Sequence, residues 1–185
     1  KIGFDHMAIL GDTLAKIAAE KAGIIKHGTA LVLESQEKEA MDVLNKAAEC
    51  ADIKTTKVVN LDEIRILPQK DGKQCFSYAG YDAVTMKMLG VHQYENAVAA
   101  MLAAELFFEK YFAGKKNVPE RKALQHAIRE GIDRTQWMGR MELVSNDPFF
   151  LMDGAHNSNG VEALKKSLET MYPDEKFHFI MGVMA

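Results

Sequence analysis

The chain has 185 residues, which is enough for one ordinary domain or for parts of two. Its composition, 48% hydrophobic and 26% charged, is that of a globular protein and excludes a disordered or fibrous one. The formal net charge of −3 gives no electrostatic reason to bind nucleic acid or an anionic membrane. No apolar run approaches the ~20 residues of a membrane span, so we expect no membrane partner.

The two cysteines and the two ends of the chain bear on its context. Cys50 and Cys75 lie in unrelated segments without metal-ligand spacing, so we expect free thiols in a reducing cytoplasm. The sequence does not begin with Met, and it ends on the apolar run 177–185. We therefore expect both ends to be cuts through a longer cytoplasmic protein.

Strands and helices alternate along the first part of the sequence. Gly11-Asp12-Thr13 supplies a turn and an N-cap before an apolar helical pattern. Asp71-Gly72 is typical of a two-residue hairpin turn, and Pro119 fits the first turn of a helix. The expected elements are strands at 2–4, 30–33, 58–59, 64–67, 74–78 and 84–88, and helices at 14–26, 38–51, 93–111 and 119–130.

The last part of the sequence predicts a separate unit. Residues 133–141 have no periodicity and are interpreted as a linker, with a domain boundary near 134–141. After them we expect a strand, a polar turn, a helix and a second strand, at 149–152, 153–159, 161–172 and 177–183. This is a βαβ unit whose turn lies at the carboxyl end of its first strand. The fold class is therefore α/β.

His6 and Lys21 are the candidate residues of the first segment. His6 follows the predicted strand at 2–4, at the edge where open α/β sheets bind ligands, although a lone His there is more often an ordinary loop residue. Lys21 shares a predicted helix face with Leu14, Ala18 and Ile25. It either snorkels to solvent, which the spacing alone favours, or is held inside the fold. Burial would favour the neutral amine, which reacts with carbon dioxide to give a carbamate, an anionic metal ligand.

Gln93 and Asn96 stand at the start of the long predicted helix. Asn96 follows His92 by four residues and Gln93 by three, so these polar groups can share one face. Carboxamides at this position can read the edge of a base through paired donors and acceptors. The alternative is that they serve only to cap the helix.

Arg140 and the turn after residue 152 are the remaining candidates. Arg140 lies in the predicted linker, where it can clamp phosphate as two domains close, or form a surface salt bridge. Asp153 can accept hydrogen bonds from ribose hydroxyls, and His156 and Asn157 can face a phosphate or an acyl group. Gly154 allows a close approach of the backbone. An ordinary polar turn explains these residues equally well.

In this order, the blocks resemble the successive motifs of folylpolyglutamate synthase/dihydrofolate synthase, a branch of the Mur ligase superfamily. The blocks are residues 3–6, 10–26, 90–97, 137–142 and 153–157. The segments GDT…AAEKAGIIK and DGAHN are more typical of the folate branch than of the peptidoglycan branch. The resemblance implies a P-loop ATPase central domain followed by a smaller Rossmann-like domain. Residues 1–139 would be the C-terminal part of the first, and residues 140–185 the beginning of the second.

The resemblance also implies a role for each candidate. It implies magnesium ligands at His6 and carbamylated Lys21, adenine contacts at Gln93 and Asn96, a phosphate clamp at Arg140, a ribose contact at Asp153 and a phosphate or glutamate contact at His156. The catalytic residues would be Lys21, Arg140 and His156. A carbamylated Lys21 in the intact enzyme should lie partly or wholly inside the fold, and we expect it there.

The implied reaction is an ATP- and Mg²⁺-dependent ligation by a monomeric enzyme. ATP phosphorylates the carboxylate of a folate, or of dihydropteroate, and the amine of L-glutamate attacks the acyl-phosphate. No Gly-rich phosphate loop ending in Lys-Ser or Lys-Thr occurs in the sequence, so we expect that loop before Lys1 and an inactive isolated chain. The alternatives are a Mur-type ligase acting on a peptidoglycan precursor and a non-catalytic nucleotide-binding module.

Overall fold

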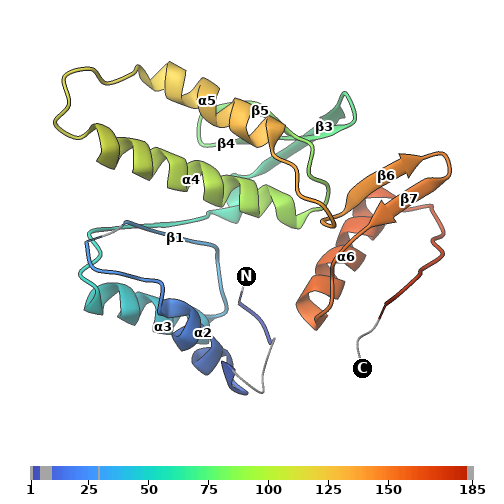
Figure 1. Ribbon diagram of the computed structural model, residues 1–185, viewed down its shortest axis with the longest axis horizontal. Helices are drawn as coiled ribbons and strands as arrows, with labels where there is room; N and C mark the ends of the chain where they lie inside the picture. The colour runs from blue at the N-terminus through green and yellow to red at the C-terminus, as the bar shows by residue number, and fades with distance from the viewer. Residues whose placement is uncertain (1, 5–9, 29, 183–185) are drawn as a thin grey trace.

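A computed structural model of the chain describes residues 2–4, 10–28 and 30–182. Three groups of elements follow one another along the chain, and each combines a small sheet with one or two helices (Figure 1). The α/β fold class is therefore confirmed. Among the described helices, none is both long and apolar enough to cross a membrane. Cys50 is exposed and Cys75 buried, and both are free thiols, as predicted.

The first group pairs two parallel strands with two helices. Its elements are α2 (Leu14–Ala22), β1 (Ala30–Leu33), α3 (Lys38–Cys50) and β2 (Thr55–Val58). The hydroxyl of Thr13 accepts from the backbone N–H of Lys16 and caps α2, as expected. Apolar side chains of α2, β1 and α3 pack into one cluster around Ala22, Leu33 and Leu44.

Two predictions in this group are wrong. Residues 2–4 form no strand; instead the backbone N–H of Ile2 donates to the side chain of Gln36 at 2.6 Å. The helix predicted at 14–26 ends at Ala22, because the following N–H groups bond to carbonyls three residues back. Gly23 bonds to Glu20 at 3.1 Å and Ile25 to Ala22 at 2.9 Å. Such bonds tighten and close the last turn of a helix.

The second group holds the largest core. Its elements are a short 3-10 helix (Leu61–Glu63), β3 (Arg65–Lys70), β4 (Lys73–Tyr78), β5 (Tyr81–Met86), α4 (His92–Phe112) and α5 (Arg121–Arg134). The three strands form one antiparallel sheet in sequence order. Asp71 and Gly72 both have positive φ, 52° and 72°, which confirms the predicted turn and fits type I′.

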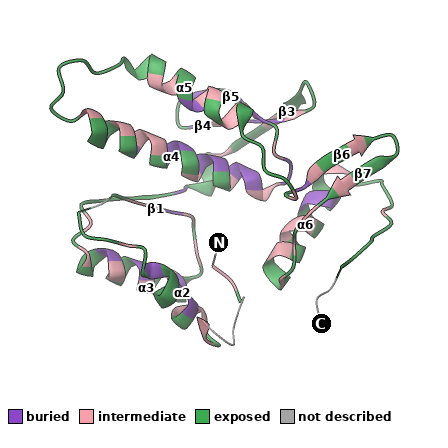
Figure 2. Cartoon of the chain, viewed as in Figure 1, coloured by how far each residue is buried: buried purple, intermediate pink, exposed green. Residues whose placement is uncertain are grey.

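The side chains at the centre of this core come from the sheet and from the two helices. Phe76, Val84, Val98 and Met101 are each no more than 1% exposed, and Ile128 of α5 packs against the same cluster. The buried residues of α4 lie mostly in its N-terminal half, as Figure 2 shows. Burying this face fixes the start of α4 firmly against the rest of the group.

The third group is a hairpin followed by a helix: β6 (Glu142–Asn146), β7 (Phe149–Met152) and α6 (Ser158–Met171). The helix was predicted, but β6 was not. The strand at 149–152 pairs antiparallel with β6, so the predicted parallel βαβ unit is not formed by the described residues.

The strand predicted at 177–183 is also wrong over its described part, because residues 177–182 form no strand. Phe177 packs its ring against Tyr172, at 5.9 Å between centroids, while the side chain of Ile180 is 94% exposed. Contact through one aromatic ring supplies no ladder of backbone hydrogen bonds, and a strand requires one. Val183 lies outside the described residues.

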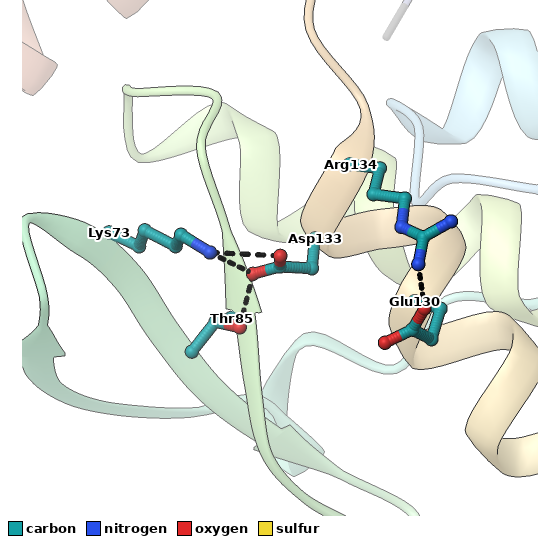
Figure 3. Close-up of polar contacts among 5 residues, drawn as sticks. All are labelled: Lys73, Thr85, Glu130, Asp133 and Arg134. Atoms are coloured by element: carbon teal, nitrogen blue, oxygen red, sulfur yellow. Dashed lines mark hydrogen bonds and ion pairs between the residues drawn. The ribbon is translucent and has the colours of Figure 1, made fainter.

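A polar contact ties α5 to the sheet of the second group (Figure 3). Lys73 of β4 donates to both carboxylate oxygens of Asp133, at 2.7 and 2.8 Å, and the hydroxyl of Thr85 donates to one of them at 2.6 Å. The hydrogen bond from Lys73 is the largest cause that holds the pKa of Asp133 below its ordinary value, and the hydrogen bond from Thr85 is the second. The neighbouring pair of Arg134 and Glu130 on α5 is mostly exposed.

We expect Asp133→Asn to lower the free energy of unfolding at pH 7 by roughly 1 kcal/mol, near the upper end for partly exposed pairs. A carboxyl whose pKa is lower in the folded than in the unfolded state stabilises the protein above the unfolded value. That stability is lost as the pH falls through the folded value. Urea unfolding at several pH values should therefore show the difference from the wild type shrinking below about pH 4. Glu130→Gln is the matched control, and an equal, pH-independent effect of both changes would contradict the assignment.

Candidate functional site

The loop at residues 88–91, just before α4, is where the sequence blocks 90–97 and 137–142 meet each other and helix α6. Gly90 has a φ of 110°, and a Cβ built on it would lie 2.8 Å from the ring of His92 and 2.8 Å from the sulfur of Met141. Leu89, Met141 and Leu168 form a small core at the same place. The start of α4, the predicted linker and α6 are therefore in direct contact, and only glycine fits at position 90.

Gln93 and Asn96 form a hydrogen-bonded pair on one face of α4, as the spacing predicted. The amide of Asn96 donates to the side-chain oxygen of Gln93 at 3.0 Å. Gln93 is 5% exposed, whereas Asn96 is exposed. The pair thus presents a carboxamide at the surface that is backed by a buried one, an arrangement suited to reading a planar polar group.

His92 is a member of this group that sequence reasoning considered only for its spacing. Its Nε2 lies 3.0 Å from the amide nitrogen of Gln93, and its Nδ1 is buried without a hydrogen-bond partner among the described residues. Burial is the main cause that lowers the pKa of His92, so the neutral ring is favoured. A neutral ring that accepts at Nε2 carries its proton at Nδ1. The sequence held no signal for this burial; in the fold the ring lies beside Gly90.

Arg140 and Asp153 are brought together by the backbone. The N–H of Gly154 donates to the carbonyl of Gly139 at 2.8 Å, and a Cβ on Gly154 would lie 3.3 Å from a guanidinium nitrogen of Arg140. The guanidinium is therefore held beside a glycine, on an exposed residue. Such a group is free to meet an anion at this edge of the protein.

Asp153 has a role that the sequence did not predict. One carboxylate oxygen accepts from the backbone N–H of Met141 and the other from that of Ala155, both at 2.8 Å. Asp153 thereby fastens the segment that carries Arg140 to the turn before α6. The predicted ribose contact remains a prediction. It would use the lone pairs of the Asp153 carboxylate that do not accept from Met141 or Ala155.

His156 and Asn157 complete this turn. His156 is exposed, and its Nδ1 lies 2.8 Å from the carbonyl oxygen of Gly154. The side chain of Asn157 accepts from the N–H of Gly160 at 2.8 Å and caps α6. The predicted contact of His156 with phosphate or glutamate is not tested by these bonds. The N-terminus of a helix beside Arg140 nevertheless favours an anion electrostatically.

Lys21 is exposed, which contradicts the expectation that it lies inside the fold. It sits in the last turn of a helix whose buried residues are Ile17, Ala18 and Ala22. Ile25, which was to extend the apolar face beyond Lys21, lies past the end of the helix. Among the described residues, no hydrogen bond or ion pair joins the Lys21 side chain to another candidate.

The magnesium site predicted at His6 and Lys21 is not assembled by the described residues. His6 lies outside them. No three His, Cys, Asp or Glu side chains within them gather in a way that suits a metal ion. The metal ligands therefore remain a prediction from the family resemblance, and the geometry adds nothing to it.

Comparison with known proteins supplies relatives along nearly the whole chain, although no protein-family model matches it. A dihydrofolate synthase/folylpolyglutamate synthase of Bacillus subtilis is 33% identical over 192 residues, covering 99% of this chain and 42% of that protein. Folylpolyglutamate synthase of Mycobacterium tuberculosis complexed with ADP matches in fold, with a TM-score of 0.70 and 29% identity. It covers 90% of this chain and 36% of its own.

A third match is an FPGS-AMPPCP-folate complex, with a TM-score of 0.79 over 92% of this chain and 41% of that one. At 24% identity it speaks for the fold alone. The chain thus spans about two fifths of the length of these relatives.

Proposed function

From its agreement with these proteins in sequence and fold, we infer that the chain belongs to the folylpolyglutamate synthase family. It spans part of the length of the members that it matches. We propose that the whole protein is an ATP-dependent ligase that adds L-glutamate to a folate, with dihydropteroate as a second candidate acceptor. The curated relative from Bacillus subtilis carries both activities in its name. A solved neighbour was obtained with an ATP analogue and folate together.

The observation that carries this proposal is the convergence at the start of α4. Gln93 and Asn96, Arg140 and the Asp153 turn lie far apart in the sequence. Hydrogen bonds and the contacts of Gly90 and Gly154 bring them to one edge of the protein. A carboxamide pair for a base, a guanidinium for phosphate and a helix N-terminus for a second anion suit a nucleotide.

The chemistry assigns a task to each group. An oxygen of the folate carboxylate attacks the γ-phosphorus of ATP, ADP leaves, and an acyl-phosphate forms. The amine of glutamate then attacks the acyl carbon, phosphate leaves with the oxygen that came from the carboxylate, and the amine loses a proton. Arg140 stabilises the charge on the phosphoryl group during transfer, and Gln93 with Asn96 holds the base. Magnesium, when bound, would neutralise phosphate charge.

The context of the enzyme is part of the proposal. We propose a cytoplasmic, monomeric protein, in line with the two free cysteines. The boundary between a central ATPase domain and a C-terminal domain near residues 139–140 is likewise proposed. The position of Arg140 between α5 and β6 supports it.

Ligation by the full-length protein tests the proposal. The protein is incubated with tetrahydrofolate, glutamate and magnesium-ATP, and the products are separated by mass. We expect folates heavier by whole glutamyl residues, formed together with ADP. A parallel reaction with dihydropteroate tests the second activity. ATP consumption without a heavier folate or pteroate would count against the assignment.

A further inference from the structure

We propose that Gln74 and Ser167 are positioning residues that grip the loop at residues 88–91 from opposite sides and thereby set the place of the Gln93–Asn96 pair. The inference rests on the proposed function, because it gives these two residues a part in selecting the nucleotide base. Neither of them lies at the exposed edge where the ligand groups converge.

The first support is the distribution of buried polar groups. Among the residues that the structure describes, the buried polar side chains are those of Gln74, Gln93 and Ser167, at 1%, 5% and 0% exposure. They come from β4, α4 and α6, and all three meet at the start of α4. A polar side chain is costly to bury unless it is hydrogen-bonded, so three in one place indicate a fixed arrangement.

Gln74 holds the loop through its amide group. Its Nε2 donates to the carbonyl of Met88 at 2.8 Å and to that of Gly90 at 3.2 Å. The same carbonyl of Gly90 accepts from the backbone N–H of Gln93 at 3.1 Å. Gln74 therefore fixes the oxygen to which the backbone of Gln93 is bonded, and it reaches that oxygen from the well-packed strand β4.

Ser167 holds the loop from the other side. Its hydroxyl oxygen accepts from the N–H of Val91 at 3.0 Å, and the hydroxyl donates to the carbonyl of Ala163 at 2.7 Å. Val91 stands at the N-cap of α4 and has no side chain that can cap the helix. α6, which lies beside the start of α4 in Figure 1, supplies the cap instead. The position of α4 is thus linked to the helix that follows the Asp153 turn.

A carboxamide discriminates between bases only if its donor and acceptor lie at fixed places. Loosening the loop from either side lets the Gln93–Asn96 pair shift relative to Arg140 and Asp153. The loss should fall on the preference for adenine rather than on phosphoryl transfer. A purely structural role in stability would not change the ratio of two nucleotides as substrates.

The experiment compares ATP with inosine triphosphate, whose base lacks the exocyclic amino group, in steady-state ligation by the full-length protein. In Ser167→Ala and Gln74→Met we expect the ratio of kcat/KM for ATP to that for inosine triphosphate to fall roughly 10-fold. Ser167→Thr, which keeps the hydroxyl, should recover most of the ratio. Phe76→Leu is the control, because Phe76 lies on the same strand as Gln74, is equally buried and contacts the main core. It should lose stability and keep the ratio.

Two comparisons make the result decisive. Gln93→Ala should lower the ratio as well. The positioning role is overturned if Gln93→Ala lowers the ratio while Ser167→Ala and Gln74→Met leave it unchanged. It is also overturned if none of these variants lowers the ratio. Hydrogen exchange of the Val91 and Gln93 amides, which needs no activity, should be faster in Ser167→Ala than in the wild type. Faster exchange in Ser167→Ala, in a protein that ligates no glutamate, would refute the proposed function but support the claim that Ser167 holds the loop. Unchanged exchange would refute that claim itself.

Discussion

Arg140→Ala in the full-length enzyme should lower kcat ~100-fold or more and leave the KM for the folate nearly unchanged. The guanidinium of the exposed Arg140 lies beside Gly154, and Asp153 holds the neighbouring backbone. There it can contact a phosphoryl group, but its charge contributes little to binding a neutral pterin ring. A group that acts on charge developing in the transition state affects turnover more than substrate binding. Steady-state kinetics with the folate and ATP varied in turn measures both parameters.

Arg134→Ala is the control for Arg140→Ala. Arg134 ends α5, six residues before Arg140, and pairs with Glu130 on the exposed side of the helix (Figure 3). Its removal deletes the same positive charge from the same region and should leave kcat within a factor of about two, as expected for a surface pair. An unchanged kcat for Arg140→Ala, or equal losses in both variants, would make Arg140 an ordinary surface residue.

Lys21→Ala should also lower kcat by roughly 100-fold, the scale of losing one charged group that acts on the transition state. The reason is the family resemblance, which implies that Lys21 carries a carbamate formed from its amine and carbon dioxide with release of a proton. A short carboxylic acid added to Lys21→Ala should restore part of the activity by standing in for the carbamate.

The carbamate can be observed without turnover. Carbon-13 NMR of the full-length protein in labelled bicarbonate should show a carbamate signal that Lys21→Ala abolishes. Lys16→Ala is the control: it removes an exposed lysine of the same helix, paired with Asp12, and should retain both signal and activity. Full activity in Lys21→Ala would leave Lys21 as a solvent-exposed side chain without a catalytic role.

Local patterns predicted most of the helices and several strands. The Asp71-Gly72 turn follows from backbone preferences of two residues, and the long apolar run of α4 from helical periodicity. The wrong predictions concern elements whose position depends on long-range strand pairing or on where a helix ends. Residues 149–152 pair with the unpredicted β6, and residues 177–182 pack through Phe177 without forming a strand. The burial of Lys21 was mispredicted because the helix closes at Ala22, before Ile25 can extend its apolar face.

For the site, spacing predicted that Gln93 and Asn96 share a face, which the hydrogen bond between them confirms. The proximity of this pair to Arg140 and Asp153 could be expected only from the order of motifs in the family. Gln74 and Ser167 carry no motif, because the groups that they meet in the loop at residues 88–91 are backbone groups. These lie 14 and 16 residues from Gln74 and 76 residues from Ser167 in the sequence. No local pattern predicts which backbone group a distant side chain will meet.

The fate of one carboxylate oxygen tests the central claim most directly. Tetrahydrofolate labelled with oxygen-18 in its terminal carboxylate is converted by the full-length protein with glutamate and magnesium-ATP, and the released phosphate is examined by mass spectrometry. An acyl-phosphate requires that one labelled oxygen pass into phosphate when the first glutamate is joined to each folate, so labelled phosphate and heavier folate should appear in equal amounts. A heavier folate accompanied only by unlabelled phosphate would contradict this mechanism, and labelled phosphate in the absence of a heavier folate would contradict ligation to glutamate.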